Sequence, residues 1–350
     1  MAVPFDFELL CELTETSGVP GYEDRIREVV TRELEPEVDE VQTDAMGNVV
    51  GTIDGESDDS VVVAAHMDEI GFMVRHVTDD GFVQVDALGG WDPRVLKAQR
   101  VTIHTDDEDV TGLIGSLPPH TLDEEQREST PDVEDIHIDT GLDGEEANDR
   151  ISKGDLVTME QSTERVGDTV TGKALDDRIC LFAMLEAARN IENPDLTVHF
   201  AATVQEEVGI RGAEALGVDL DPDLAIALDV TVANDVPGFE PADHVTELGD
   251  GTAVKLKDSS VIANPKVHQR LQSVADEEDI DFQLEVLPAG GTDTAGFQRA
   301  GGAVPAGAIS IPTRYLHTVT ESAHVDDVSA TIDLLTAFLE TEDGEYDYTL

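Results

Sequence analysis

Two kinds of hydrophobic pattern alternate along both ends of the chain. Apolar residues recur at helical spacing in segments such as 5–16 and 22–34, whereas 60–65 and 224–230 are short continuous apolar runs. The first pattern predicts amphipathic helices, and the second predicts strands that a sheet buries on both faces. Further elements are expected at 48–53, 169–174, 177–189, 196–205, 211–215, 265–277, 282–287, 306–311 and 325–339. Strands that alternate with helices predict an α/β fold with a mostly parallel sheet flanked by helices.

Between residues 71 and 167 the pattern changes to short strands at close spacing. Strands are expected at 72–76, 82–86, 100–104, 110–114 and 155–160, and no long helical pattern interrupts them. Turn sequences such as Asp79-Asp80-Gly81 and Pro118-Pro119 lie between them. We therefore predict a small all-β domain at 71–168, inserted into an α/β domain made of residues 1–70 and 169–350.

The chain is strongly acidic: 21 Lys and Arg stand against 77 Asp and Glu, a formal net charge of −56. This charge excludes a nucleic-acid partner and argues against an anionic membrane surface, because both require a basic face. Disorder is not expected, because 40% of the residues are apolar. Acids are spread over almost the whole chain, lysines number six against fifteen arginines, and aromatic residues make up 4%. Such a composition is typical of a cytosolic protein from a halophile.

The cysteines and the N-terminal segment point to the cytoplasm. Cys11 and Cys180 are far apart and form no CxxC pair, which fits a reducing compartment and excludes a disulfide framework or a cysteine zinc site. Residues 1–10 contain no basic residue, so we expect no secretory signal. No apolar run reaches the ~18 residues that a membrane span needs.

Side chains of metal-ligand type recur where the predicted strands end. They are His66 and Asp68, Asp176 and Asp177, Glu206 and Glu207, Asp229, and His317. One acidic pair in so acidic a chain predicts little, and a lone histidine is usually structural. Open α/β sheets, however, build their sites at the carboxyl ends of strands. Because the strands before these residues are apolar, the carboxylates lie against the core, where a charge needs a metal or a partner.

Two histidines and three carboxylates suit two metal ions, if one carboxylate bridges them. Zn²⁺ or Co²⁺ takes imidazole nitrogen and carboxylate oxygen at about three protein positions and leaves one position open. Asp68, two positions after His66, is placed to orient that histidine. The pair Glu206-Glu207 offers one ligand and one free carboxylate that can accept a proton from a water.

A set of motifs resembles the tetrahedral aminopeptidase family, dinuclear metallopeptidases also labelled glutamyl aminopeptidase or endoglucanase. The resemblance covers about residues 9–339. Its motifs are Ser17-Gly18-Val19-Pro20-Gly21-Tyr22-Glu23, Met46-Gly47-Asn48, Ala65-His66-Met67-Asp68-Glu69-Ile70-Gly71, residues 115–120, Lys173-Ala174-Leu175-Asp176-Asp177-Arg178, Gln205-Glu206-Glu207-Val208-Gly209, Gly290-Gly291-Thr292-Asp293 and Tyr315-Leu316-His317-Thr318. Together with the acidic composition, this resemblance indicates an origin in a halophilic archaeon.

The resemblance implies a role for each candidate residue. His66 and Asp229 bind one ion, Glu207 and His317 bind the other, and Asp176 bridges them. Glu206 is the general base and Asp68 orients His66. In related dimetal peptidases the peptide bond after the bridging aspartate is cis, so we expect a cis bond between Asp176 and Asp177.

The family also implies an assembly. The inserted domain resembles its PDZ-like domain, which serves in assembly, and family members typically form twelve-subunit hollow tetrahedra that trim short peptides. We therefore expect a homo-oligomer, a dodecamer, with short peptides as substrates. Cys180 stands where the family usually has glycine, and we expect it to alter helix packing rather than chemistry. The segment 290–293 is expected to shape the substrate pocket.

The sequence predicts a metal-dependent aminopeptidase that removes N-terminal residues from short peptides. An N-acyl amino acid deacylase of the same metal clan remains an alternative, because the same ligands would serve it. A glycosidase needs two carboxylates but no histidine-bound metal. A non-enzymatic acidic nucleic-acid mimic explains the charge but not the ligand set. The sequence decides neither the preferred N-terminal residue nor whether the metal is zinc, cobalt or manganese.

Overall fold

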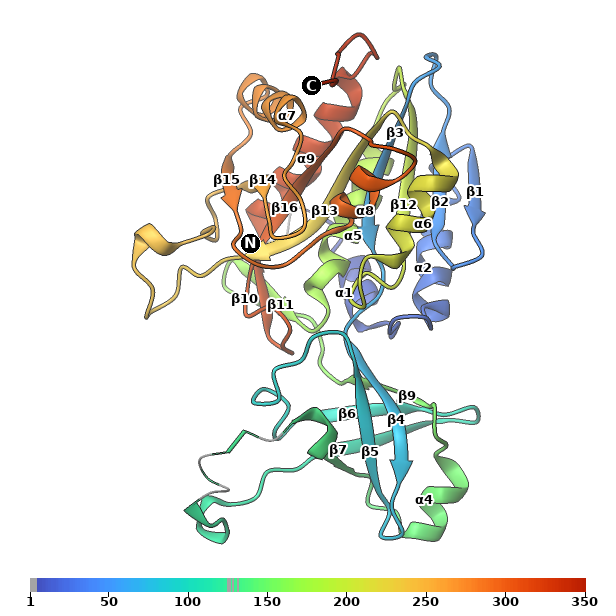
Figure 1. Cartoon of the computed structure of the whole chain (residues 1–350), viewed down its shortest axis with the longest axis vertical. Helices are drawn as coiled ribbons and strands as arrows, with labels where there is room; N and C mark the ends of the chain where they lie inside the picture. The colour runs from blue at the N-terminus through green and yellow to red at the C-terminus, as the bar shows by residue number, and fades with distance from the viewer. Residues whose placement is uncertain (1–4, 125–126, 128, 131) are drawn as a thin grey trace.

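A computed structural model describes residues 5–124, 127, 129–130 and 132–350. The expectation about a secretory signal rests partly on residues 1–4, which lie outside these ranges. No helix in the described ranges is long and apolar enough to cross a membrane. The chain forms a large α/β body and a smaller β barrel, which lies below the large body in Figure 1.

One eleven-stranded sheet forms the centre of the large body. Its main path runs through β1 (Glu40–Thr43), β2 (Val49–Ile53), β12 (Thr197–Thr203), β3 (Ser60–His66), β13 (Leu224–Val232), β16 (Ala306–Arg314), β17 (Glu321–His324), β11 (Thr169–Gly172) and β10 (Glu164–Val166). Off this path, β14 (Thr252–Lys257) pairs with β16 and with β15 (Phe282–Val286). The central strands β12, β3, β13 and β16 are parallel, and the flanking pairs are mostly antiparallel.

Helices bury both faces of this sheet, as the continuous apolar runs predict. Val61, Val63 and Ala65 of β3 pack into one core, whereas Val62 and Ala64 pack into the core on the opposite face. The first core includes α1 (Phe7–Glu15), α2 (Asp24–Leu34), α5 (Leu175–Asn190), α7 (Pro265–Glu277) and α9 (Val325–Thr341). The second includes α6 (Arg211–Leu220) and α8 (Asp293–Arg299). The predicted α/β class is thus confirmed.

The smaller body is a closed six-stranded barrel with its own hydrophobic core. Its strands are β4 (Gly71–Val77), β5 (Phe82–Leu88), β8 (His137–Asp139), β7 (Asp109–Ile114), β6 (Arg100–His104) and β9 (Leu156–Met159). Two single 3₁₀ turns, η1 (Pro119–Thr121) and η2 (Val133–Asp135), interrupt them. The prediction of an all-β insert was incomplete, because the helix α4 (Gly144–Arg150) also lies in it. Only Ala147 of α4 is buried, so the helix has no apolar stripe that periodicity could detect.

The barrel lies beside the end of the sheet that carries the predicted ligands. Residues 67–70 alone connect β3 to β4, so the carboxyl end of β3 faces the barrel. Strand β10 lies within the range predicted for the insert but pairs with β11 of the large sheet. The division of the chain into domains at residues 70 and 168 remains a prediction.

Several elements of the large body were not predicted. Strand β14 was not predicted because its sequence contains Lys255, which resembles a surface residue. In the structure Lys255 is fully buried and forms an ion pair with Glu285 of β15. Helix α8 and strand β17 are too short for a clear period. Each of the three nevertheless lies close to the site described below.

Candidate metal centre

Four parallel strands bring Glu206 and four of the five predicted ligands to the same edge of the sheet, and Asp176 joins them from the start of α5. His66 is the last residue of β3 and pairs in register with Thr203, the last residue of β12. Glu206 and Glu207 follow β12, Asp229 lies in β13, and His317 follows β16. These side chains gather because the carboxyl ends of parallel strands meet at one edge.

Asp176 lies between the two histidines. Its Oδ1 is 3.3 Å from Nε2 of His66, and its Oδ2 is 3.3 Å from Nε2 of His317. The helix α5 is not regular at this point, because Asp176 and Asp177 have non-helical backbone angles. The bond between them is the predicted cis peptide. A carboxylate with one oxygen toward each histidine is placed to bridge two cations.

Two groups of side chains have ligand atoms close enough to share an ion. In each group the ligand atoms lie within 4.8 Å of one another. One group is His66, Asp176 and Glu207, and the other is His66, Asp177 and Asp229. His317 joins the first group, with its Nε2 3.8 Å from Oε2 of Glu207. The structure therefore brings all five predicted ligands together, although which ion each one binds remains a prediction.

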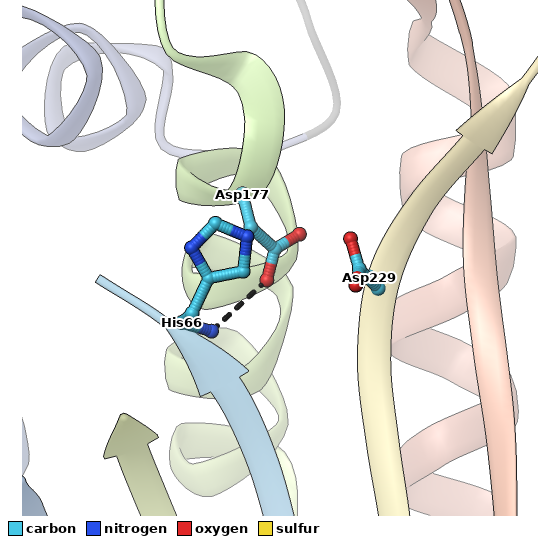
Figure 2. A group of neighbouring side chains, drawn as sticks. All are labelled: His66, Asp177 and Asp229. Atoms are coloured by element: carbon cyan, nitrogen blue, oxygen red, sulfur yellow. Dashed lines mark hydrogen bonds between the residues drawn. The ribbon is translucent and has the colours of Figure 1, made fainter. Parts of the chain in front are cut away.

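Asp177 is a member of this cluster that the sequence did not single out as a ligand. Its Oδ2 accepts a hydrogen bond from the main-chain N–H of His66 at 3.1 Å. Its Oδ1 is buried and has no hydrogen-bond partner in the described residues. Figure 2 shows the carboxylates of Asp177 and Asp229 facing each other across a gap. Asp177 thus fixes the end of β3, and burial raises the pKa of its carboxyl well above the usual range.

Asp68 acts mainly on the main chain of the two glutamates. Its Oδ1 accepts from the N–H of Glu206 at 3.0 Å, and its Oδ2 accepts from the N–H of Glu207 at 3.1 Å. The Nδ1 of His66 is 3.0 Å from the main-chain oxygen of Asp68 and 3.6 Å from its carboxylate. A proton on Nδ1, shared with that carbonyl, leaves Nε2 free as a ligand. Asp68 thus meets His66 through its main-chain oxygen rather than its carboxylate and holds the turn after β12, whereas the predicted role of the Asp68 side chain in orienting His66 remains a prediction.

Glu321 is a second acidic residue that the sequence analysis missed. It is 2% exposed and lies on the short strand β17. One carboxylate oxygen accepts from the N–H of Asp176 at 3.0 Å, and the other accepts from the N–H of His317 at 2.8 Å. Burial raises the pKa of Glu321 to about 8. This residue joins two ligand-bearing loops, and no sequence pattern marked it.

A loop of the barrel orients the other histidine. The Nδ1 of His317 is 2.7 Å from the main-chain oxygen of Gly90, which follows β5. A Cβ atom at position 90 would lie 3.3 Å from that nitrogen, so a larger residue there would press on the ring and require it to shift by a few tenths of an ångström. The inserted body therefore helps to direct Nε2 of His317 toward Asp176.

The electrostatics of the site favour divalent cations. Burial raises the pKa values of Glu206, Glu207 and Asp229 well above the usual range, and neighbouring carboxylates raise them further. Burial lowers the pKa of His317, but the bond with Asp176 outweighs it and the value rises to about 10. The Oε1 of Glu207 is buried with no hydrogen-bond partner in the described residues. Unpaired buried carboxylates beside imidazole nitrogens fit two divalent ions.

A cavity of about 650 Å³ gives access to the cluster. Asp176, Glu206, Glu207, Asp229 and His317 all contribute to its wall. Gly290 and Gly291 line another part of it, whereas Thr292 and Asp293 do not, and the role of segment 290–293 in shaping the substrate pocket remains a prediction. Parallel strands that deliver histidines and carboxylates to an open cavity define a class of metal-dependent hydrolase.

Comparison with known proteins agrees with this class. The sequence profile of the M42 glutamyl aminopeptidases matches residues 47–334. The lysyl aminopeptidase of Pyrococcus furiosus is 38% identical, over 96% of this chain and 97% of that protein. The chain belongs to the M42 aminopeptidase family, and the prediction of an aminopeptidase is confirmed.

Solved structures give the same result. The aminopeptidase APDkam598 of Desulfurococcus kamchatkensis superposes with a TM-score of 0.92 at 37% identity, covering 96% of this chain and 94% of that one. The TET1 peptidase of Pyrococcus horikoshii superposes with a TM-score of 0.87 at 32% identity, covering 96% and 99%. That peptidase is described as assembling into a tetrahedron or a large octahedral shell.

Proposed function

We propose that this metal-dependent aminopeptidase uses two divalent ions, Zn²⁺ or Co²⁺, to remove N-terminal residues from short peptides. The main support for two ions is the position of Asp176, because one of its carboxylate oxygens lies 3.3 Å from Nε2 of His66 and the other lies 3.3 Å from Nε2 of His317. His66 and Asp229 would hold one ion, Glu207 and His317 would hold the other, and Asp176 would serve both. The bound ions would supply Lewis acidity toward the scissile carbonyl and toward a nearby water.

Glu206 is the general base in this mechanism. Its side chain lines the cavity, and burial raises its pKa well above that of an exposed glutamate. A carboxylate with a raised pKa accepts a proton more readily near neutral pH. Glu206 takes the proton of the attacking water and then passes it to the leaving amine. Asp68 positions Glu206 and Glu207 for these different roles through their main-chain N–H groups.

Two adjacent substitutions test the assignment. Glu206→Gln is expected to retain both ions and lose most activity, because an amide cannot accept the proton. Glu207→Gln is expected to lose an ion from one site. Metal analysis of both purified variants, with hydrolysis of aminoacyl-anilides, distinguishes them. Full occupancy in Glu207→Gln with metal loss in Glu206→Gln would reverse the two roles.

An N-acyl amino acid deacylase is the remaining alternative from the same metal clan. It would act on a blocked amine, whereas an aminopeptidase needs a free N-terminal amine. Assay of free and N-acetylated versions of one peptide separates them: cleavage of the free peptide alone supports the aminopeptidase. Loss of activity after chelation argues against both a glycosidase and a nucleic-acid mimic.

Assembly and environment complete the proposal. The chain covers 99% of a TET1 peptidase that is described as forming closed shells. We infer that it forms a dodecamer through its inserted barrel, a PDZ-like assembly domain. Leu113 and Leu117, on and after β7 of the barrel, are exposed apolar residues suited to such contacts. The charge of −56 fits work in a halophile cytoplasm at molar salt, where the repulsion between subunits is screened.

A further inference from the structure

Beyond the predicted ligands and Glu206, the wall of the active-site cavity is mostly aliphatic. Its aliphatic side chains are Ile210, Val230, Val232, Leu287, Ala289 and Leu316. The polar exceptions are Asp92 and Thr231, and the Oγ1 of Thr231 is buried with no hydrogen-bond partner in the described residues. No lysine or arginine is among the described residues that line the cavity. Of its acidic residues, only Asp92 has no proposed role at the ions.

The charged groups nearest this wall are engaged elsewhere. The carboxylate of Asp92 accepts from Nε of Arg94 at 2.9 Å and 2.8 Å. Arg211 follows Ile210 in the chain, but its guanidinium bonds Gln205 and does not line the cavity. Lys257 meets Leu287 through its main-chain oxygen, and its side chain is also absent from the cavity wall. An acidic substrate side chain would therefore find no lysine or arginine on this wall, and a basic one would find only Asp92, which is already paired with Arg94.

We infer that this cavity selects peptides whose N-terminal side chain is aliphatic and uncharged. The inference rests on the proposed aminopeptidase function and adds a substrate class to it. A charged side chain placed against this wall loses water without gaining an ion pair, which is costly. Two bound divalent ions would offset the charge of the four carboxylates at the predicted metal site that line the cavity, which would then offer no free anion to a lysine side chain. The family is described as glutamyl aminopeptidases, and one relative is a lysyl aminopeptidase. Peptides that begin with glutamate or lysine are therefore the alternative substrates to test.

Ile210 and Gly291 set the width of the aliphatic wall. A Cβ atom at position 291 would lie 3.5 Å from Cδ1 of Ile210 and 3.1 Å from Oγ of Ser260. Any larger residue at 291 would therefore fill space next to Ile210. Ile210 has a positive φ of 60°, which is rare for a β-branched residue. Such backbone strain is typical of functional sites, and here it accompanies a side chain directed at the cavity.

A panel of aminoacyl-anilides tests the inference on the metal-loaded oligomer. Leucyl substrate is expected to have a kcat/KM at least about tenfold above the lysyl and glutamyl substrates, a ratio within the range for one well-fitted apolar pocket. A lysyl or glutamyl substrate that equals leucyl overturns the inference and leaves the aminopeptidase function intact. No cleavage of any substrate by protein with both ions bound overturns the two together.

A charge placed on the wall should change the preference. Ile210→Asp suits a positive φ better than isoleucine does, so it is expected to fold and to lower the leucyl-to-lysyl ratio by about tenfold or more. Ala289→Asp, at an exposed position of the same wall, should act in the same direction. Val218→Asp is the control, because Val218 is 58% exposed on α6 and outside the cavity. Equal ratios in the wild type, both wall variants and the control would overturn the inference, provided that metal content is unchanged.

Discussion

Replacement of Asp68 by asparagine isolates the contact that holds the two glutamates. In the wild type, the two oxygens of Asp68 accept from the N–H groups of Glu206 and Glu207 at 3.0 Å and 3.1 Å. Asparagine has nearly the same shape but only one acceptor oxygen. Its NH₂ group would face one of the two N–H donors, which would then lie in the site without a partner.

The expected loss of stability follows from the number of hydrogen bonds that Asp68 accepts. A hydrogen bond to a charged group contributes about 1.5–3 kcal/mol, and the variant loses one of two. We therefore expect Asp68→Asn to lower the free energy of unfolding by about 1.5–3 kcal/mol. Because the displaced donor belongs to Glu206 or Glu207, we also expect weaker metal binding or a lower kcat. These two effects are separable, because the first persists after the ions are removed.

The assay is urea unfolding at fixed molar KCl and fixed protein concentration, with and without a chelator. The denaturant midpoint should fall in both conditions with an unchanged slope. Asp80→Asn is the matched control, because Asp80 is exposed in a turn of the barrel. The explanation is refuted if Asp68→Asn stays within about 0.5 kcal/mol of the wild type, the range of ordinary surface substitutions, and binds both ions normally.

Three further predictions follow from other parts of the structure. The carboxylate of Glu321 accepts hydrogen bonds from the N–H groups of Asp176 and His317, so Glu321→Gln should weaken the binding of both ions. Chelator competition measures the two affinities, and unchanged affinities would contradict this role. Burial raises the pKa of Glu23 to about 7 from its ordinary 4.5, so ionisation should destabilise the fold as pH rises between these values. The melting temperature of the wild type should thus fall relative to Glu23→Gln over that interval, and parallel curves would disprove it. Subunits should dissociate at low salt before they lose metal, because the length over which salt screens their mutual repulsion grows from ~3 Å at 1 M to ~10 Å at 0.1 M. Sedimentation and activity across a KCl series test this order, and a stable active oligomer at ~0.1 M KCl would count against it.

Local hydrophobic patterns in the sequence predicted most of the helices and strands of the fold. The continuous apolar runs of β3 and β13 required burial on two faces, and most of the helices that cover them, though not α8, were visible at helical spacing. The pattern failed for β14, because a buried Lys255 balanced by Glu285 resembles a surface residue in the sequence. It also failed for α4, because a single buried residue makes no stripe.

The sequence by itself determined which residue types stand at the strand ends and therefore which chemistry the chain can support. His66, Asp176, Glu207, Asp229 and His317 were identifiable because they follow buried strands within recognisable motifs. The proximity of His66, Glu207, Asp229 and His317 follows from the parallel pairing of β3, β12, β13 and β16, whereas Asp176 reaches them from the start of α5.

Only the tertiary structure decided what orients those ligands. Glu321 contacts Asp176 across 145 positions, and Gly90 contacts His317 across 227. Both contacts involve main-chain groups, and every residue except proline carries the same main-chain donor and acceptor. A periodic pattern reveals which face a side chain occupies, but it contains no information about which distant main-chain group that side chain meets. For the same reason, the aliphatic wall of the cavity, assembled from four separate segments, emerged only once the chain was folded.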